Sequence, residues 1–107
     1  MEVMISITEQ LEIIREVRKR FCEIIDKKIN TGLCLLLSSS IFKRGYRNYD
    51  RTDIRKYLPE FTYENAAKHC GAIEIGQEDP YDYYWWEEED FESRLKFLDW
   101  LEEDLLK

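Results

Sequence analysis

The sequence predicts a mainly α, compact single-domain bundle of four to five helices, with an irregular aromatic segment before the C-terminal helix. Apolar residues recur at three- and four-residue intervals near both ends of the chain, which is the helical period. The chain has only four glycines and two prolines, and its 107 residues with 44% hydrophobic composition suffice for one core. Because no repeat or linker interrupts it, we interpret residues 1–107 as a single helical domain.

The first helix is expected to begin at Ser6, which can form a capping box with Glu9 three residues later. Its stop signal is Asn30-Thr31-Gly32, where the glycine is suited to the left-handed conformation that closes many helices. Between these ends an apolar stripe with helical spacing predicts the buried face. That stripe consists of Leu11, Ile14, Val17, Phe21, Ile24 and Ile25.

The next segment is apolar on every side from Leu33 to Leu37, which indicates burial. We predict a second helix here, capped by Thr31 and ended by Gly45. A buried strand is the alternative, because a short apolar run does not distinguish a helix from a strand by its period.

Two short helices are expected in the middle of the chain. Thr52 or Asp53 can cap the first, which ends before Pro59 because the residue preceding proline disfavours the helical conformation. Thr62 can cap the second, and Gly71 can close it.

The C-terminal helix has the clearest pattern. Asp90 is a suitable N-cap, and the acidic run Glu87 to Glu89 precedes the helix, where the macrodipole favours negative charge. One apolar face with helical spacing then predicts a buried side. It consists of Phe91, Leu95, Leu98, Leu101 and Leu105.

The aromatic run before this helix is too dense for one buried face. Along an extended segment, Tyr83 and Trp85 would point to one side, and Tyr84 and Trp86 to the other. We expect one pair to enter the core. The other pair would then cover a neighbouring element, line a pocket or form an interface between protomers.

Charge and composition exclude several classes of partner. The net charge is −7, and residues 78–107 carry twelve acids against three bases, so bulk nucleic acid and anionic membranes are not expected partners. No apolar run approaches the ~18 residues that span a bilayer, and no secretory leader is recognisable. Three cysteines without a repeating spacing are typical of reduced thiols, so we expect a cytoplasmic protein.

Catalytic and metal-binding patterns are also missing from the sequence. His69 is the only histidine, the cysteines lack metal-ligand spacing, and no glycine-rich phosphate loop occurs. Most carboxylates lie in runs that favour a solvated surface over a tuned acid–base pair. We therefore expect a protein that is not an enzyme and needs neither metal nor cofactor.

A basic segment, residues 42–57, is the best candidate for a ligand site. Aromatic side chains alternate there with six bases, which suits stacking on a nucleobase while arginines hold phosphate. The alternative is a surface loop that forms ion pairs with the acidic C-terminal third of the chain. The candidate ligand-binding residues are Lys43, Arg44, Tyr46, Arg47, Tyr49 and Arg51, together with Tyr84, Trp86 and Arg94.

Three motifs follow one another along the chain: Gly-Leu-Cys at 32–34, Tyr-Tyr-Trp-Trp at 83–86, and Arg94 with Phe97, Leu98 and Leu101. In this order they resemble a group of small, mostly uncharacterised proteins encoded by bacteriophages and prophages. Glu87 stands where that group often has proline after the tryptophans.

The resemblance implies a context of phage–host conflict. Small phage proteins of this kind bind host factors, and some sequester nucleotide-derived messengers of bacterial immunity, usually as homo-oligomers. We therefore expect a non-enzymatic protein that sequesters a small phosphorylated nucleotide-like ligand in the host cytoplasm. The alternative is an acidic interaction module that inhibits a host protein by direct binding.

Overall fold

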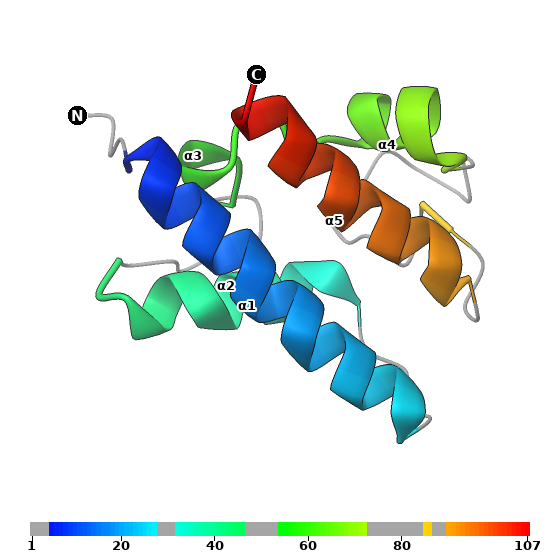
Figure 1. Ribbon diagram of the computed structural model, residues 1–107, viewed down its shortest axis with the longest axis horizontal. Helices are drawn as coiled ribbons and strands as arrows, with labels where there is room; N and C mark the ends of the chain where they lie inside the picture. The colour runs from blue at the N-terminus through cyan, green and yellow to red at the C-terminus, as the bar shows by residue number, and fades with distance from the viewer. Residues whose placement is uncertain (1–4, 28–31, 47–53, 73–84, 87–89) are drawn as a thin grey trace.

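The computed structural model describes residues 5–27, 32–46, 54–72, 85–86 and 90–107 (Figure 1). Within these ranges the regular structure is helical, and no strand occurs. The helices are α1 (Ile7–Asp26), α2 (Leu33–Lys43), α3 (Ile54–Tyr57), α4 (Tyr63–Cys70) and α5 (Phe91–Leu105). The predicted mainly α bundle is therefore confirmed, and the strand alternative for the second element is wrong.

α1 lies between α2 and α5 and contacts both. It runs antiparallel to α5, while α4 packs against α5 and α3 against α2 (Figure 1). The described residues include no helix that is both long enough and apolar enough to cross a membrane.

The buried face of α1 differs from the predicted stripe. The residues that it buries fully are Ile13, Ile14, Val17 and Phe21, while Leu11 is only partly buried. The reason is that α1 packs against α2 on one side and α5 on the other, so it buries a broader face than one line of side chains.

The link between α1 and α2 requires two corrections. α1 ends at Asp26, with Lys27 as its C-cap, and the predicted stop residues Asn30 and Thr31 lie outside the described residues. Gly32 has an extended backbone, with φ −80° and ψ 158°, and it is the N-cap of α2, the position predicted for Thr31. It thus begins the second helix and does not close the first in a left-handed conformation.

The remaining caps agree with the sequence where they are described. Thr62 accepts a hydrogen bond from the Asn65 amide at 3.2 Å, and α4 closes at Gly71 with φ 68°. Asp90 accepts one from the Ser93 amide at 3.1 Å. α2 ends two residues before Gly45, as expected, whereas the predicted caps of α3 lie outside the described residues.

An aromatic cluster forms the core between α4 and α5. Both Trp85 and Trp86 are 1% exposed, and their ring centroids are 5.9 Å apart. Phe97 lies 5.8 Å from Trp86, and Phe61 lies 5.2 Å from Trp85. The expected alternation is wrong for these two residues, because they lie in a turn, where neighbouring side chains need not point to opposite sides.

Candidate functional site

The structure places the predicted ligand-binding residues at two separate locations. Lys43 is the last residue of α2, and Arg44 and Tyr46 follow it, at the left of Figure 1. Trp86 and Arg94 lie near the start of α5, at the right of the same view. These residues therefore do not share one pocket. The other candidates, Arg47, Tyr49, Arg51 and Tyr84, lie outside the described residues.

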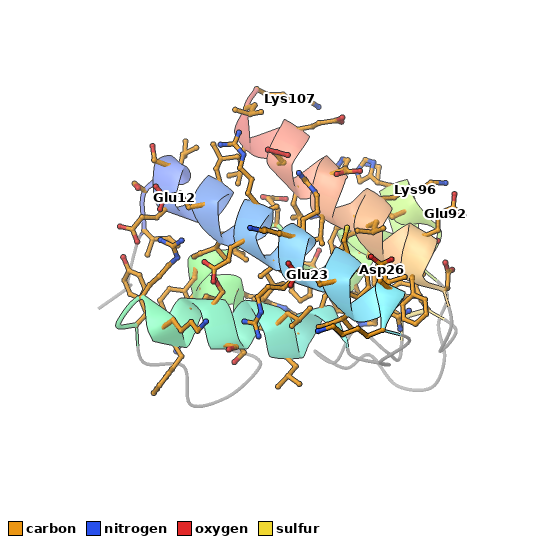
Figure 2. All side chains as sticks on the ribbon, turned by 60° about the horizontal axis from the view of Figure 1, so that its bottom comes forward. Glu12, Glu23, Asp26, Glu92, Lys96 and Lys107 are labelled. Atoms are coloured by element: carbon orange, nitrogen blue, oxygen red, sulfur yellow. The ribbon has the colours of Figure 1, made fainter. Side chains whose placement is uncertain are left out.

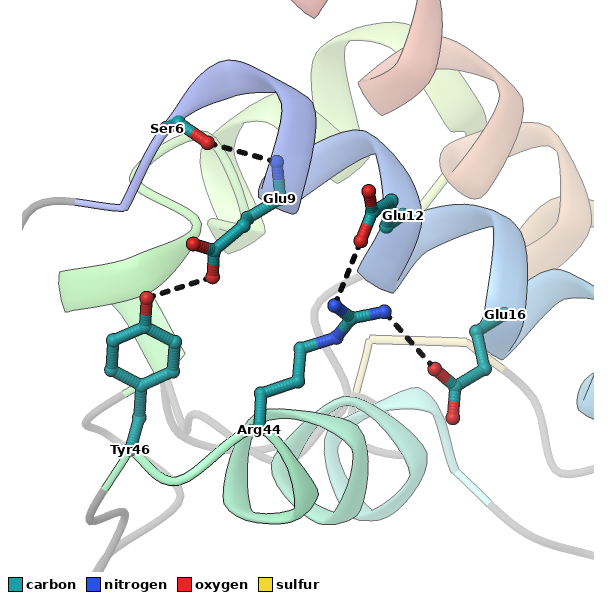
Figure 3. Close-up of polar contacts among 6 residues, drawn as sticks. All are labelled: Ser6, Glu9, Glu12, Glu16, Arg44 and Tyr46. Carbon is teal, nitrogen blue, oxygen red and sulfur yellow. Dashed lines mark hydrogen bonds and ion pairs between the residues drawn. The ribbon is translucent and has the colours of Figure 1, made fainter.

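The first location is a polar cluster between α1 and the end of α2 (Figure 3). Arg44 donates from Nη1 to Glu12 Oε2 at 2.9 Å and from Nη2 to Glu16 Oε2 at 3.3 Å. Glu12 and Glu16 are four residues apart, so they lie on one face of α1 and hold the guanidinium between them. Arg44 thereby links the end of α2 to α1 through residues that are 28 and 32 positions apart in sequence.

Tyr46 extends this cluster toward the beginning of α1. Its hydroxyl donates to Glu9 Oε2 at 2.7 Å (Figure 3). Its ring lies 5.2 Å from the ring of Tyr57. Ser6 accepts from the Glu9 amide at 3.1 Å, which is the predicted N-cap contact. In a capping box the carboxylate of Glu9 would accept from the backbone amide of Ser6. In the structure this carboxylate accepts from the hydroxyl of Tyr46.

The contacts of this cluster change its expected chemistry. Three glutamates of α1 accept hydrogen bonds from Arg44 and Tyr46, so these donors are already engaged. A phosphate at Arg44 would have to displace charged acceptors of comparable strength. The alternative prediction, pairing with the acidic C-terminal third, is wrong for Arg44, because the partners of this residue lie on α1.

The acids of the C-terminal helix pair with the arginines of α1. Arg18 contacts Asp99 at 3.0 Å and Glu102 at 2.7 Å, and Arg15 contacts Glu102 at 2.6 Å. Hydrogen bonds from Arg15 and Arg18 lower the pKa of Glu102 below its ordinary value of 4.5. Ion pairs thus link α1 to α2 through Arg44, and to α5 through Asp99 and Glu102.

We expect the Tyr46–Glu9 contact to stabilise the fold until the tyrosine ionises. The hydrogen bond to Glu9 raises the pKa of Tyr46 above 10.0, with burial acting in the same direction. Because the folded-state pKa exceeds the unfolded one, the stabilisation is complete below the unfolded pKa and is lost as pH rises through the raised value. The difference in unfolding free energy between wild type and Tyr46→Phe should therefore be constant from about pH 7 to 9 and vanish at higher pH.

Urea denaturation at a series of pH values measures this difference. Glu9→Gln is the matched control, because it keeps an acceptor for the hydroxyl and removes the charge, so the loss should be smaller and should be complete at a lower pH than in wild type. A difference that grows with pH would contradict the assignment.

The second location is part of the core. Arg94 is 1% exposed, and its guanidinium carbon lies 5.7 Å from the Trp86 ring centroid and 6.0 Å from that of Phe91. It donates from Nη1 to the Asp90 carbonyl at 2.8 Å. Trp86 donates from Nε1 to the carbonyl of Cys70 at 3.1 Å. Both side chains therefore hold the start of α5 and present no surface to a ligand in solution.

The other described side chains that could react or bind a metal do not form a cluster. His69 is exposed and stacks on Trp100 with ring centroids 4.5 Å apart, and burial raises the pKa of the Cys70 thiol. In the described ranges no three His, Cys, Asp or Glu side chains are placed to hold a metal ion.

A depression between α1, α5 and the α3–α4 link has about 10 Å³ of room, which suits one water molecule. It is lined by Gln10, Ile14, Leu58, Glu60, Leu101 and Leu105.

Two further features of the chain bear on binding. The described residues contain thirteen acids and thirteen bases, so they are electrically neutral. Residues 73–89, here named the acidic segment, contain seven acids and no base, which equals the net charge of the whole chain. The sequence already indicated part of it through the run Glu87 to Glu89 and the acid excess of residues 78–107. Figure 2 labels three of the acids on α1, Glu12, Glu23 and Asp26, then Glu92 and Lys96 on α5, and Lys107 beyond the end of α5.

The second feature is apolar. Leu35 and Phe42 on α2 are 50% and 68% exposed, although the rest of this helix is largely buried. Their seven-residue spacing places both on one face and was readable from the sequence.

Comparison of the chain with protein-family models, with curated proteins and with solved structures found no match.

Proposed function

We propose that this protein is a non-enzymatic interaction module that binds a basic surface on a host protein through its acidic segment and inhibits that protein by covering the surface. The observation that carries this proposal is the burial of Trp85 and Trp86, each 1% exposed, near the C-terminal end of the acidic segment. The two tryptophans themselves are anchored in a helical body whose described charges balance.

Concentrated charge of one sign has a direct effect on association. A strongly negative patch attracts a positively charged partner before contact and raises the rate of productive encounters. Ion pairs elsewhere compete with this use, since Asp99 and Glu102 already bind arginines of α1. The acidic segment is therefore a stronger candidate for the recognition element than the outer face of α5.

Affinity capture from a bacterial lysate tests the proposal. Wild type should retain a stoichiometric basic protein at low salt and release it at about 0.5 M salt, where charges are screened within a few ångströms. The triple variant Glu87→Gln, Glu88→Gln and Glu89→Gln should lose this protein.

The matched control neutralises the same number of acids on the helices, with Glu64→Gln, Glu92→Gln and Glu103→Gln. All three side chains are exposed, and this control should retain the partner. Circular dichroism verifies that both variants are folded. Equal retention by both variants would contradict the proposal.

A second candidate is sequestration of a small phosphorylated nucleotide-like ligand, including a messenger of bacterial immunity. It is favoured by the surface at the end of α2, where Lys43 is exposed, Phe42 is 68% exposed and Gly45 has φ 91° with open space on its side-chain face. An exposed ring and an ammonium group beside an open backbone suit a base and a phosphate.

Equilibrium dialysis against cyclic dinucleotides and ADP-ribose separates this candidate from the first. Sequestration predicts stoichiometric depletion of one of these ligands, with loss in Lys43→Glu and retention in the acidic-segment variant. No depletion at protein concentrations of about 100 µM would exclude sequestration at useful affinity.

A further inference from the structure

The α2 helix has an uncharged outer face in a highly charged protein. From Leu33 to Phe42 it contains no charged residue, whereas 36% of the chain is charged. Six of its eleven residues are buried against the bundle. Its remaining side chains include Leu35, 50% exposed, and Phe42, 68% exposed.

The spacing on this face is symmetric. Leu35 and Phe42 are seven residues apart, which is two helical turns, so they lie near opposite ends of one exposed face. Ser38 and Ser39 lie midway between them and are partly buried. A pair of large apolar groups therefore flanks a centre with small side chains.

We propose that this face binds a second copy of the chain, with the two α2 helices antiparallel about a two-fold axis that passes between Ser38 and Ser39. In this arrangement Leu35 of each copy meets Phe42 of the other, because a two-fold interface pairs residue i with j and j with i. The small serines lie at the crossing, where short side chains allow two helix axes to approach closely.

The charge distribution favours a second copy as the occupant. Two chains of net charge −7 repel each other, so they can meet only where few like charges come together. The Leu33–Phe42 stretch of α2 satisfies this condition. The adjacent cation Arg44 is neutralised by Glu12 and Glu16, and the antiparallel arrangement separates the Lys43 ammonium groups to opposite ends of the interface.

The size of the face limits the affinity. A helix of eleven residues is about 16 Å long, and two exposed apolar side chains supply well under the ~800 Å² per partner typical of stable complexes. The expected dimer is therefore weak and in rapid exchange, with a dissociation constant in the high micromolar range.

Sedimentation velocity of the full chain between about 10 µM and about 1 mM tests the proposal, because a weak dimer becomes populated within this range. Wild type should shift from the monomer toward twice its mass. Leu35→Asp and Phe42→Asp should each remain monomeric throughout, because the two-fold axis places each new carboxylate against an apolar group twice.

Ile7→Asp and Leu106→Asp are matched controls. They alter apolar side chains of similar exposure, 56% and 61%, on α1 and at the end of α5, and they should dimerise like wild type. A further variant tests the register: Leu35→Asp combined with Phe42→Lys places opposite charges together across the axis and should regain the dimer.

Three results would overturn the proposal. These are a monomeric wild type at about 1 mM, a dimer that survives Phe42→Asp, or a dimer disrupted equally by Ile7→Asp. Failure of the acidic-segment capture experiment would leave this result unaffected, because the variants in the two tests alter different residues.

Discussion

Trp86→Ala is expected to lower the free energy of unfolding by about 3–5 kcal/mol, the range for removing a large aromatic side chain from a core. Trp86 is 1% exposed and lies within 6 Å of the rings of Trp85 and Phe97. The substitution also leaves the Cys70 carbonyl without the indole donor 3.1 Å away. Because small domains are stable by about 5–15 kcal/mol, this loss approaches the total stability.

Urea denaturation followed by circular dichroism measures the change. Trp86→Phe is the matched control, since it keeps an aromatic ring and removes mainly the donor, and it should cost clearly less than alanine. A role for Trp86 in holding a ligand from solution predicts the opposite: alanine would leave stability unchanged and abolish binding. That outcome would contradict the core assignment.

Arg94→Ala is expected to lower the free energy of unfolding by about 2–4 kcal/mol, through a cavity and a buried carbonyl that loses its donor. Its guanidinium is packed near the rings of Trp86 and Phe91 and donates to the Asp90 carbonyl at the start of α5. Arg94→Met should recover part of the loss, because it refills the space without the donor. Thermal and urea denaturation measure both variants.

Arg55→Ala is the control for removing an arginine in general. Arg55 is exposed on α3, and its replacement should leave stability unchanged within error. If Arg94→Ala were equally silent, the buried guanidinium would not contribute to the fold, and its position in the predicted ligand set would regain support.

The C-terminal helix shows which buried residues the helical period predicts and which it does not. The predicted face included Leu98 and Leu101, which are buried, but the structure also buries Phe97 and Arg94 completely. Aromatic and arginine side chains are long enough to enter a core from the flank of a helix, and the position of the neighbouring Trp86 decides whether they do. No property of α5 alone contains that information.

The candidate site illustrates the same limit. Lys43, Arg44 and Tyr46 were singled out by composition, and they are sequence neighbours at the end of α2 and just beyond it. Composition could not reveal that Glu9, Glu12 and Glu16 engage Arg44 and Tyr46, because these contacts join residues 28 to 37 positions apart.

The sequence by itself determined the helical class and most described caps, including Ser6, Thr62 and Asp90, because a cap satisfies backbone groups within one turn of its own position. Only the tertiary structure decided that both tryptophans are buried and that Arg44 pairs with α1 and not with the acidic C-terminal third. Those outcomes depend on how helices distant in sequence cross, and the crossing follows from the packing of all the side chains between them.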